Sequence, residues 1–491
     1  MIDLPIYLAG KPLRTSQRIG ITAPGTSRVV GRACWAQMRH AQQAVSLIET
    51  GQKKLAELAS CQRQVICRNM LDYVSANREK FARCISQEAG KPIATAKGEV
   101  DRALTTFRLA VEESTRVEGF QPAADIDARS LGYYATVERV PAGPCVFITP
   151  FNFPLNLVAH KIAPAIACGC SFILKPSERT PLTALLLGEG LRLSGLPPES
   201  WAILPCDADV ARYLTGADPI RVVSFTGSVA VGYEIQRQAV GKKIILELGS
   251  NSAVIVEADA DVSDAVDRIV PAAFGYAGQS CISVQRIFLH RRIARQAMER
   301  LVEKTRQLKV GDPALAATDV GPMIDEAASV RIEEWVASAV GSGAKVLIGG
   351  KRGGAYYMPT LLADVPAGAE VVQNEAFGPV AVIDIYSDIS DALREINKSH
   401  FGLQLGIFSD QLSLIRRVFR SAQVGAVVVN DVPTTRIDAL PYGGVKASGI
   451  GREGVRWAIA ELTELKTLLV RDKALPRTNN PSQTVRKNRK A

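Results

Sequence analysis

A glycine-bearing loop, Gly278-Gln279-Ser280-Cys281, places one of the nine cysteines just ahead of an apolar run. A cysteine in such a loop can be exposed and nucleophilic, whereas most cysteines are buried as small apolar residues. Glu247 ends another apolar run 34 residues earlier. A carboxylate desolvated at a strand edge has a raised pKa that suits a general base, but it could also be a structural acid bonded to nearby amides.

A third polar side chain, Asn152, stands in the turn 149–154 between an apolar run and a helical segment. Its amide could point into the crevice beyond the strand ends, or it could cap the helix, which this segment alone favours. The cysteines form no C-x-x-C pair, and Cys168 and Cys170 lie two apart in an apolar run. Because this spacing is poor for zinc, no metal site is predicted.

Four further polar segments lie in turns or at the ends of apolar runs. Lys175-Pro176-Ser177-Glu178 could bind ribose hydroxyls or form an exposed ion pair. Phe225-Thr226-Gly227-Ser228, followed by Gly232, could present N–H groups to a phosphate, although it lacks the G-x-G-x-x-G and Walker spacings. The segments 374–379 and 441–453 are rich in turn residues and could be loops only.

The elements that must position these residues alternate along the chain. Residues 1–31 are turn-rich and strand-like, 33–115 have helical periodicity, and a helix is predicted over 155–168. Strands alternating with helices imply right-handed crossovers and a parallel sheet covered on both faces, which is a doubly wound nucleotide-binding architecture. The predicted strands of this series are Cys145–Thr149, Ser171–Leu174, Ala202–Leu204, Val222–Phe225, Ile244–Leu246 and Ala253–Val256, and those of a second series are Ile282–Leu289, Lys345–Ile348, Val380–Ile385 and Val427–Val429.

Composition narrows the class of protein. With 491 residues, 47% apolar and 22% charged, the chain is globular, with room for two to four domains. Seven Lys/Arg and one Asp in 471–491 account for six of the ten net positive charges, so the body is only mildly basic and nucleic acid is not a predicted partner. The N-terminus has no uninterrupted apolar region of a signal peptide, and no uncharged run is long enough to span a membrane. A cytoplasmic protein without a membrane partner is predicted.

Taken together and in their order along the chain, the seven segments resemble the NAD(P)-dependent aldehyde dehydrogenase superfamily, over roughly residues 5–470. The resemblance implies an α/β fold with a doubly wound parallel-sheet nucleotide-binding domain, a second α/β catalytic domain and a small β oligomerisation extension. The corresponding boundaries are 1–122 and 142–250 for NAD(P) binding, 251–440 for catalysis, and 123–141 with 455–470 for strands that assemble a homodimer or homotetramer. Residues 471–491 are predicted to be a basic disordered tail.

The resemblance also implies residue roles. Cys281 would be the nucleophile, Asn152 and the Cys281 N–H would form the oxyanion hole, and Glu247 would activate water for hydrolysis of a thioester. Lys161 and Glu464 match positions that the family associates with proton relay. The implied cofactor-binding residues are Thr149, Pro150, Phe151, Lys175, Ser177, Glu178, Thr226, Gly227, Ser228, Leu248, Gly249, Glu375 and Phe377.

The predicted reaction is oxidation of a small polar or anionic aldehyde to its carboxylate through a Cys281 thiohemiacetal and thioester. Segments 151–164 and 436–444 are similar to the lactaldehyde, phosphonoacetaldehyde and non-phosphorylating glyceraldehyde-3-phosphate branch, and Arg108, His160 and Arg436 are the candidate substrate residues. Glu178 would repel a 2′-phosphate, so NAD is predicted over NADP, with NADP possible. Two alternatives are a CoA-acylating semialdehyde dehydrogenase, which usually lacks the glutamate base, and a non-catalytic NAD-binding protein.

Overall fold

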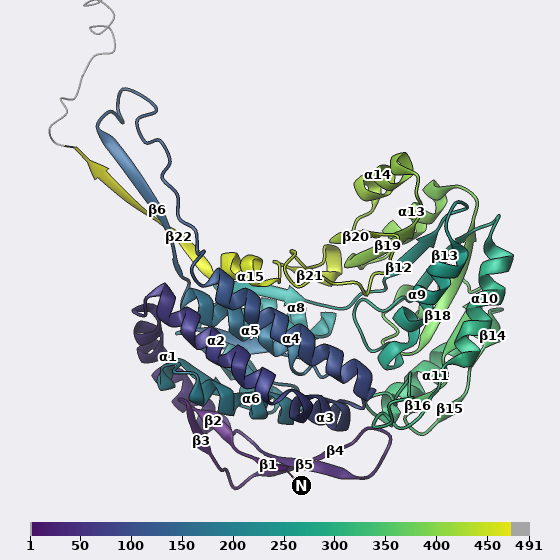
Figure 1. The fold of residues 1–491 in the computed structure, drawn as a ribbon, viewed down its shortest axis with the longest axis horizontal. Helices are drawn as coiled ribbons and strands as arrows, with labels where there is room; N and C mark the ends of the chain where they lie inside the picture. Colours follow the sequence, from purple (N-terminus) through teal and green to yellow (C-terminus); the bar gives the residue numbers. More distant parts are fainter. Residues whose placement is uncertain (1, 473–491) are drawn as a thin grey trace, which may run out of the picture.

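The structure is a computed structural model that describes residues 2–472. Two α/β units lie side by side, and an arm of two strands projects from the first of them (Figure 1). This arrangement confirms the predicted fold class.

The first unit contains an eight-stranded sheet whose five central strands run parallel. Antiparallel strands close both edges, so the row of carboxyl ends is confined to the centre of the sheet. The order is β21 (Gly449–Ile450), β11 (Lys243–Glu247), β10 (Val222–Thr226), β7 (Cys145–Ile148), β8 (Phe172–Lys175), β9 (Trp201–Ile203), β2 (Ile6–Leu8) and β3 (Lys11–Leu13).

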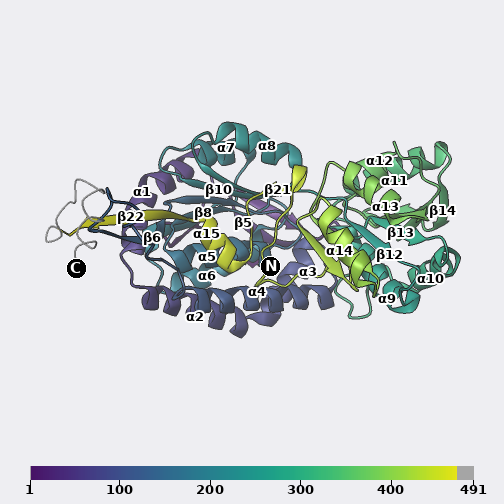
Figure 2. The ribbon, with the colours of Figure 1, turned by 90° about the horizontal axis from the view of Figure 1, so that it is seen from above.

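Helices cover both faces of this sheet (Figure 2). On one face lie α2 (Ser60–Ala76), α4 (Ile93–Glu113), α5 (Asn156–Cys168) and α6 (Pro181–Leu193), and on the other α1 (Met38–Ala56), α7 (Ala208–Gly216) and α8 (Val229–Gln238). Every residue of α5 is buried, because this helix packs against α2, α4 and α15 (Val455–Glu461) as well as the sheet. The helix predicted over 155–168 is therefore confirmed. Two remaining elements complete the unit, α3 (Arg78–Ala89) and the small sheet of β1 (Ile2–Leu4), β5 (Val29–Cys34) and β4 (Arg18–Thr22).

The second unit is built on a seven-stranded sheet that is parallel except at one edge. Its order is β14 (Lys345–Ile348), β17 (Thr360–Ala363), β18 (Val380–Tyr386), β13 (Arg286–His290), β12 (Ala253–Val256), β19 (Gln404–Phe408) and β20 (Ala426–Val429), with the hairpin β15 (Arg352–Gly353) and β16 (Tyr356–Tyr357) beside it. The covering helices are α9 (Val262–Phe274), α10 (Ala294–Gln307), α11 (Glu326–Gly341), α12 (Glu370–Gln373), α13 (Ile389–Lys398) and α14 (Leu412–Ser421).

Two strand predictions need correction in this unit. The run Ala253–Val256, assigned to the first series, is instead the centre of the second sheet, because the chain leaves the first unit after Glu247. The strand predicted from Ile282 begins only at Arg286, and residues 282–285 belong to the loop that follows Cys281. No helix in the described part of the chain is both long enough and apolar enough to cross a membrane.

The arm consists of β6 (Tyr133–Pro141) and β22 (Thr463–Arg471), paired antiparallel from Thr463↔Pro141 to Arg471↔Tyr133. Its leucines Leu465, Leu468 and Leu469 are exposed. The strand predicted over 455–470 is wrong in its first half, because 455–461 form helix α15. Most of the predicted tail, 473–491, lies outside the described residues.

Candidate active site

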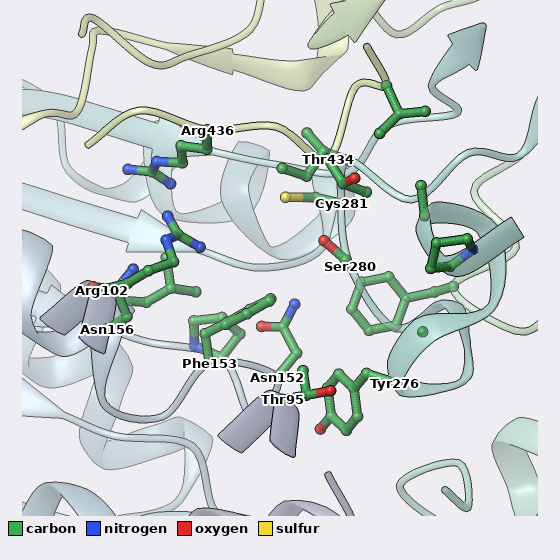
Figure 3. A pocket seen from close by; sticks show the side chains of 18 of the residues that line it. Thr95, Arg102, Asn152, Phe153, Asn156, Tyr276, Ser280, Cys281, Thr434 and Arg436 are labelled. Carbon is green, nitrogen blue, oxygen red and sulfur yellow. The ribbon is translucent and has the colours of Figure 1, made fainter. Parts of the chain in front are cut away.

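A cavity of about 990 Å³ is lined by residues of both units, among them Asn152, Glu247 and Cys281. Asn152 and Glu247 come from the carboxyl ends of the first sheet, and Cys281 comes from the loop between α9 and β13. In Figure 3 the Cys281 sulfur points toward the side of the cavity on which the Arg102 and Arg436 guanidinium groups lie. The three residues predicted to carry the chemistry therefore share one cavity.

The loop that carries Cys281 is held in a defined conformation. After α9 the chain makes a tight turn in which Tyr276 and Ala277 have positive φ angles of 52° and 53°. The fully buried Gln279 anchors the turn, since its Oε1 accepts a hydrogen bond from the Ile324 N–H at 2.8 Å. Gly278 is required there, because a Cβ would lie 2.2 Å from the Gly378 carbonyl oxygen. Because this strained turn is anchored, it fixes the position of the Cys281 sulfur.

The Cys281 thiol is protonated at neutral pH in this state, because burial raises its pKa to about 12. Its Sγ lies 3.3 Å from the Tyr442 hydroxyl. The Asn152 amide nitrogen donates one hydrogen bond to the Gln279 carbonyl at 3.0 Å, which holds it against the cysteine loop. Because an amide nitrogen carries two hydrogens, one remains for an oxygen in the cavity.

Glu247 ends β11 with its carboxyl group buried, and neither oxygen has a hydrogen-bond partner among the described residues. Burial, and then the nearby Glu453 carboxylate, raise the Glu247 pKa well above its usual value. A buried carboxyl group whose oxygens both have unused hydrogen-bonding capacity is suited to take a proton from a small molecule such as water.

The residues predicted for the cofactor divide into two groups. Those that line the cavity are Pro150, Phe151, Thr226, Gly227, Ser228, Leu248, Gly249, Glu375 and Phe377. Thr149 is buried behind them. Lys175 ends β8, Ser177 and Glu178 follow it, and all three lie outside the lining. Lys175 Nζ lies 3.3 Å from Glu178 Oε1, and the Glu178 side chain is half exposed.

The cavity wall fits a dinucleotide. Within residues 2–472 the buried hydroxyl of Thr226 has no hydrogen-bond partner, and the side chain of Ser228, the N-cap residue before α8, makes no capping hydrogen bond, so these hydroxyls and the helix N-terminus are available to a phosphate. Gly227 and Gly249 let the backbone pack closely against neighbouring side chains. A Cβ at Gly227 would lie 2.4 Å from the Phe225 ring, and a Cβ at Gly249 would lie 2.6 Å from the Glu375 carboxylate. Phe377, with a φ of 44°, packs edge-on against Phe151 at 5.8 Å.

A network of buried charges borders the nucleophile. Arg436 lies 3.3 Å from Glu453 and 3.4 Å from Asp438, and its guanidinium stacks 3.7 Å above the Tyr442 ring. Arg102 binds Asp438 at 2.6 Å. Lys161 Nζ lies 3.1 Å from Glu453 Oε1; burial raises the Glu453 pKa, but the charges of Lys161 and Arg436 outweigh it and hold that pKa down to about 2. The network thus joins three basic side chains, those of Arg102, Arg436 and Lys161, to two acidic ones, those of Asp438 and Glu453.

Three further predicted site residues, Arg108, His160 and Glu464, do not lie in the cavity lining. Arg108 is exposed on α4 and does not line the cavity, because it lies six residues, about one and two-thirds helical turns, from Arg102, which does. His160 is buried behind the wall, where its Nε2 lies 2.9 Å from Asp438, and burial lowers its pKa to about 4, so it is neutral. Glu464 lies on the arm, where it binds Lys243 at 3.0 Å and does not reach Lys161.

The residues that sequence reasoning missed are Arg102, Asn156, Asp438, Tyr442 and Glu453. Of these, Tyr442 and Glu453 fall inside the glycine-rich segment 441–453, which had been singled out as a whole without a role for either residue. Asp438 follows Arg436 by two residues. Only Arg102 and Asn156 carry no local signal, because each lies inside an ordinary amphipathic or apolar helix pattern.

Comparison with known proteins agrees with this geometry. The aldehyde dehydrogenase family model matches residues 13–468. The chain is 38% identical over 466 residues to a 3-sulfolactaldehyde dehydrogenase of Priestia aryabhattai, covering 95% of this chain and 97% of that one. Among solved structures it is similar to aldehyde dehydrogenase 21 of Physcomitrella patens in complex with the reaction product succinate, with a TM-score of 0.95, 39% identity and coverage of 97% and 99%.

A second solved relative is the glyceraldehyde-3-phosphate dehydrogenase GapN of Methanocaldococcus jannaschii complexed with NADP, with a TM-score of 0.89, 33% identity and coverage of 93% and 100%. The two α/β units and the cysteine at their shared cavity define an NAD(P)-dependent aldehyde oxidoreductase. The chain belongs to the aldehyde dehydrogenase family.

Proposed function

We propose that this enzyme oxidises a small, polar or anionic aldehyde to its carboxylate, with Cys281 as nucleophile, Asn152 as oxyanion donor and Glu247 as base. The observation that carries the proposal is the cavity in which these three side chains and the guanidinium of Arg102 meet. A purely structural role would not explain why the two carboxyl oxygens of Glu247 and the amide oxygen of Asn152, all buried at this cavity, have no hydrogen-bond partner among the described residues.

The chemistry begins at the sulfur. The Cys281 thiol gives its proton to a water molecule in the cavity, its Sγ adds to the aldehyde carbon, and the carbonyl oxygen becomes an alkoxide. The free hydrogen of the Asn152 amide and the Cys281 backbone N–H stabilise that charge, at roughly 3–4 kcal/mol per donor in comparable sites. The nicotinamide cofactor, when bound, accepts the hydride that leaves the same carbon. A thioester to Cys281 then remains.

Hydrolysis of the thioester requires a second proton acceptor. Glu247 takes a proton from a water molecule as the water oxygen adds to the thioester carbon. The carbon–sulfur bond breaks, the carboxylate product leaves and the thiol is restored. Glu453, which contacts Lys161 and lies near Glu247, replaces Glu464 as the acidic partner in a path that returns the proton toward solvent.

The charge around the cavity supports a polar or anionic substrate. Arg102 is about one third exposed in the cavity wall, where the buried amide nitrogen of Asn156 has no hydrogen-bond partner in the described part of the chain. The partly exposed Arg102 guanidinium attracts an anionic end group in a space walled by protein. The relatives named for sulfolactaldehyde and crystallised with succinate act on, or release, molecules of this kind.

Replacing Arg102 by glutamine should raise KM about tenfold for succinate semialdehyde and less than twofold for propanal, because only the former has a charge for the guanidinium to bind. Initial rates over a panel that includes lactaldehyde, hexanal and benzaldehyde test this expectation. Arg108→Gln, on the exposed side of the same helix, is the matched control and should behave as wild type. Equal effects of Arg102→Gln on charged and neutral aldehydes, or a wild-type preference for hexanal, would overturn the proposed substrate class.

Glu178 supports NAD as the preferred cofactor. Its carboxylate follows the strand end where the adenosine ribose is proposed to bind, and it already holds the Lys175 ammonium that would otherwise attract a phosphate. At a half-exposed site, repulsion of a 2′-phosphate is worth on the order of 1 kcal/mol, so kcat/KM should favour NAD about fivefold. Glu178→Gln should narrow that ratio without changing the rate with saturating NAD. A wild-type kcat/KM that is as high with NADP would contradict this preference.

The arm supports assembly into a homodimer or homotetramer. Leu465 and Leu469 lie on one face of the two-stranded ribbon and Leu468 on the other, so the ribbon carries exposed apolar side chains on both faces, and an isolated ribbon is only marginally stable in water. Pairing with another subunit would cover it. The cytoplasmic location stays a prediction.

A further inference from the structure

The proposed nucleophile contacts the hydroxyl of Tyr442, whose Oη lies 3.3 Å from Cys281 Sγ. This distance suits a hydrogen bond to sulfur, and both side chains line the cavity. Among the described residues, Cys281 Sγ has no other hydrogen-bond partner. The sulfur therefore depends on this one hydroxyl for its polar contact.

The tyrosine is held in place by the charge network. The Arg436 guanidinium stacks 3.7 Å above the Tyr442 ring and is itself fixed by Glu453 and Asp438. The Tyr442 backbone N–H donates to the Glu453 carbonyl at 3.0 Å, and the Glu453 N–H donates back at 2.7 Å. A cation over the ring withdraws electron density from the phenol, which makes its O–H a stronger donor. The ring cannot rotate away without breaking this stack.

We propose that Tyr442 is a further catalytic residue, whose hydroxyl donates a hydrogen bond to the Cys281 sulfur and stabilises the thiolate before it attacks the aldehyde. The inference rests on the proposed role of Cys281 as nucleophile. The thiol proton passes to a water molecule in the cavity, the sulfur gains the negative charge, and the Tyr442 proton stays on its oxygen throughout. Hydrogen bonds to charged groups are among the stronger ones, and here the sulfur has few competing donors.

The contribution matters because the site otherwise opposes ionisation. Burial is the largest influence on the pKa of the Cys281 thiol and raises it, and the carboxyl groups of Glu375 and Glu247 raise it further. The Tyr442 hydrogen bond and the Arg436 charge lower this pKa. Once the sulfur is bonded to carbon it is a weak acceptor. The hydroxyl is then released, so the bond favours the thiolate over the later adducts.

The test is the pH profile of Cys281 alkylation by iodoacetamide in the full-length enzyme without cofactor, followed by mass spectrometry of the Cys281 peptide and by loss of activity. Tyr442→Phe keeps the ring and its stack but removes the donor. We expect the profile to move to higher pH, so that alkylation below the thiol pKa is about tenfold slower, with kcat/KM reduced similarly. Tyr73→Phe, which removes a hydroxyl bonded to the Leu186 carbonyl far from the cavity, is the control and should leave the profile unchanged.

An unchanged profile in Tyr442→Phe, or a change no larger than that of Tyr73→Phe, would overturn the inference. If alkylation of Cys281 does not inactivate the enzyme, the proposed nucleophile itself is wrong, which is a separate outcome. Should Tyr442→Phe fail to bind NAD, the same profile is measured with 3-fluorotyrosine at position 442. Its more acidic hydroxyl is the stronger donor, so alkylation should be faster than in wild type, and an equal or slower rate would overturn the inference.

Discussion

Cys281→Ser should lower kcat/KM for aldehyde oxidation by at least about 10³-fold, because a serine hydroxyl at neutral pH supplies almost no alkoxide to attack the carbonyl. The substitution removes no packing of consequence, since the two side chains differ by one atom and Cys281 is held by its loop rather than by its sulfur. Binding of NAD, followed by quenching of protein fluorescence, should stay within about twofold of wild type because no cofactor contact is lost.

The control for thiol loss as such is Cys61→Ser, since Cys61 is the exposed cysteine at the start of α2 and lies away from the cavity. This variant should retain full turnover. Turnover near the wild-type level in Cys281→Ser, measured as formation of reduced cofactor, would show that the nucleophile has been assigned to the wrong residue.

Glu247→Gln should give a burst of reduced cofactor approaching one equivalent per active site, followed by a steady-state rate lowered about 10²–10⁴-fold. The burst survives because hydride leaves before the base is needed, and the stall follows because glutamine cannot take a proton from water. The acyl group should be visible as a mass increase on the Cys281 peptide after quenching. Complete loss of the burst would place Glu247 at an earlier step.

The pH dependence has the same origin. Burial, and then the Glu453 carboxylate, raise the Glu247 pKa well above its usual value, so Glu247 takes up a proton at a higher pH than a free glutamate does, and the wild-type hydrolysis step should slow as the pH falls. Holding this carboxylate ionised in the folded state costs stability above its unfolded pKa. Because neither carboxyl oxygen has a partner to lose, Glu247→Gln should melt at an equal or higher temperature at pH 8.

Glu464→Gln provides the matched carboxylate control. Its side chain is exposed on β22 and bound to Lys243, so the variant should show wild-type burst and steady-state rates. A defect in Glu464→Gln comparable with that of Glu247→Gln would instead restore Glu464 to the proton path and remove Glu453 from it.

The sequence alone determined the residues that lie at strand ends. Asn152, Glu247 and the cofactor segments each follow a short apolar run, and the carboxyl ends of neighbouring parallel strands must meet at one edge of a sheet. Cys281 was identified because its loop comes in the expected order after them. These features are local, since a few adjacent residues fix both the strand and the turn that follows.

Only the tertiary structure decided which charged residues reach the cavity. Arg102 and Arg108 lie on one helix, and its amphipathic pattern shows which side is buried but not which part of that side meets a loop more than 300 residues later. Likewise Glu453 and Glu464 follow each other closely, yet one binds Lys161 on α5 and the other lies on the arm. Contacts between segments so far apart depend on how helices and sheets pack, and no local pattern of residues specifies that.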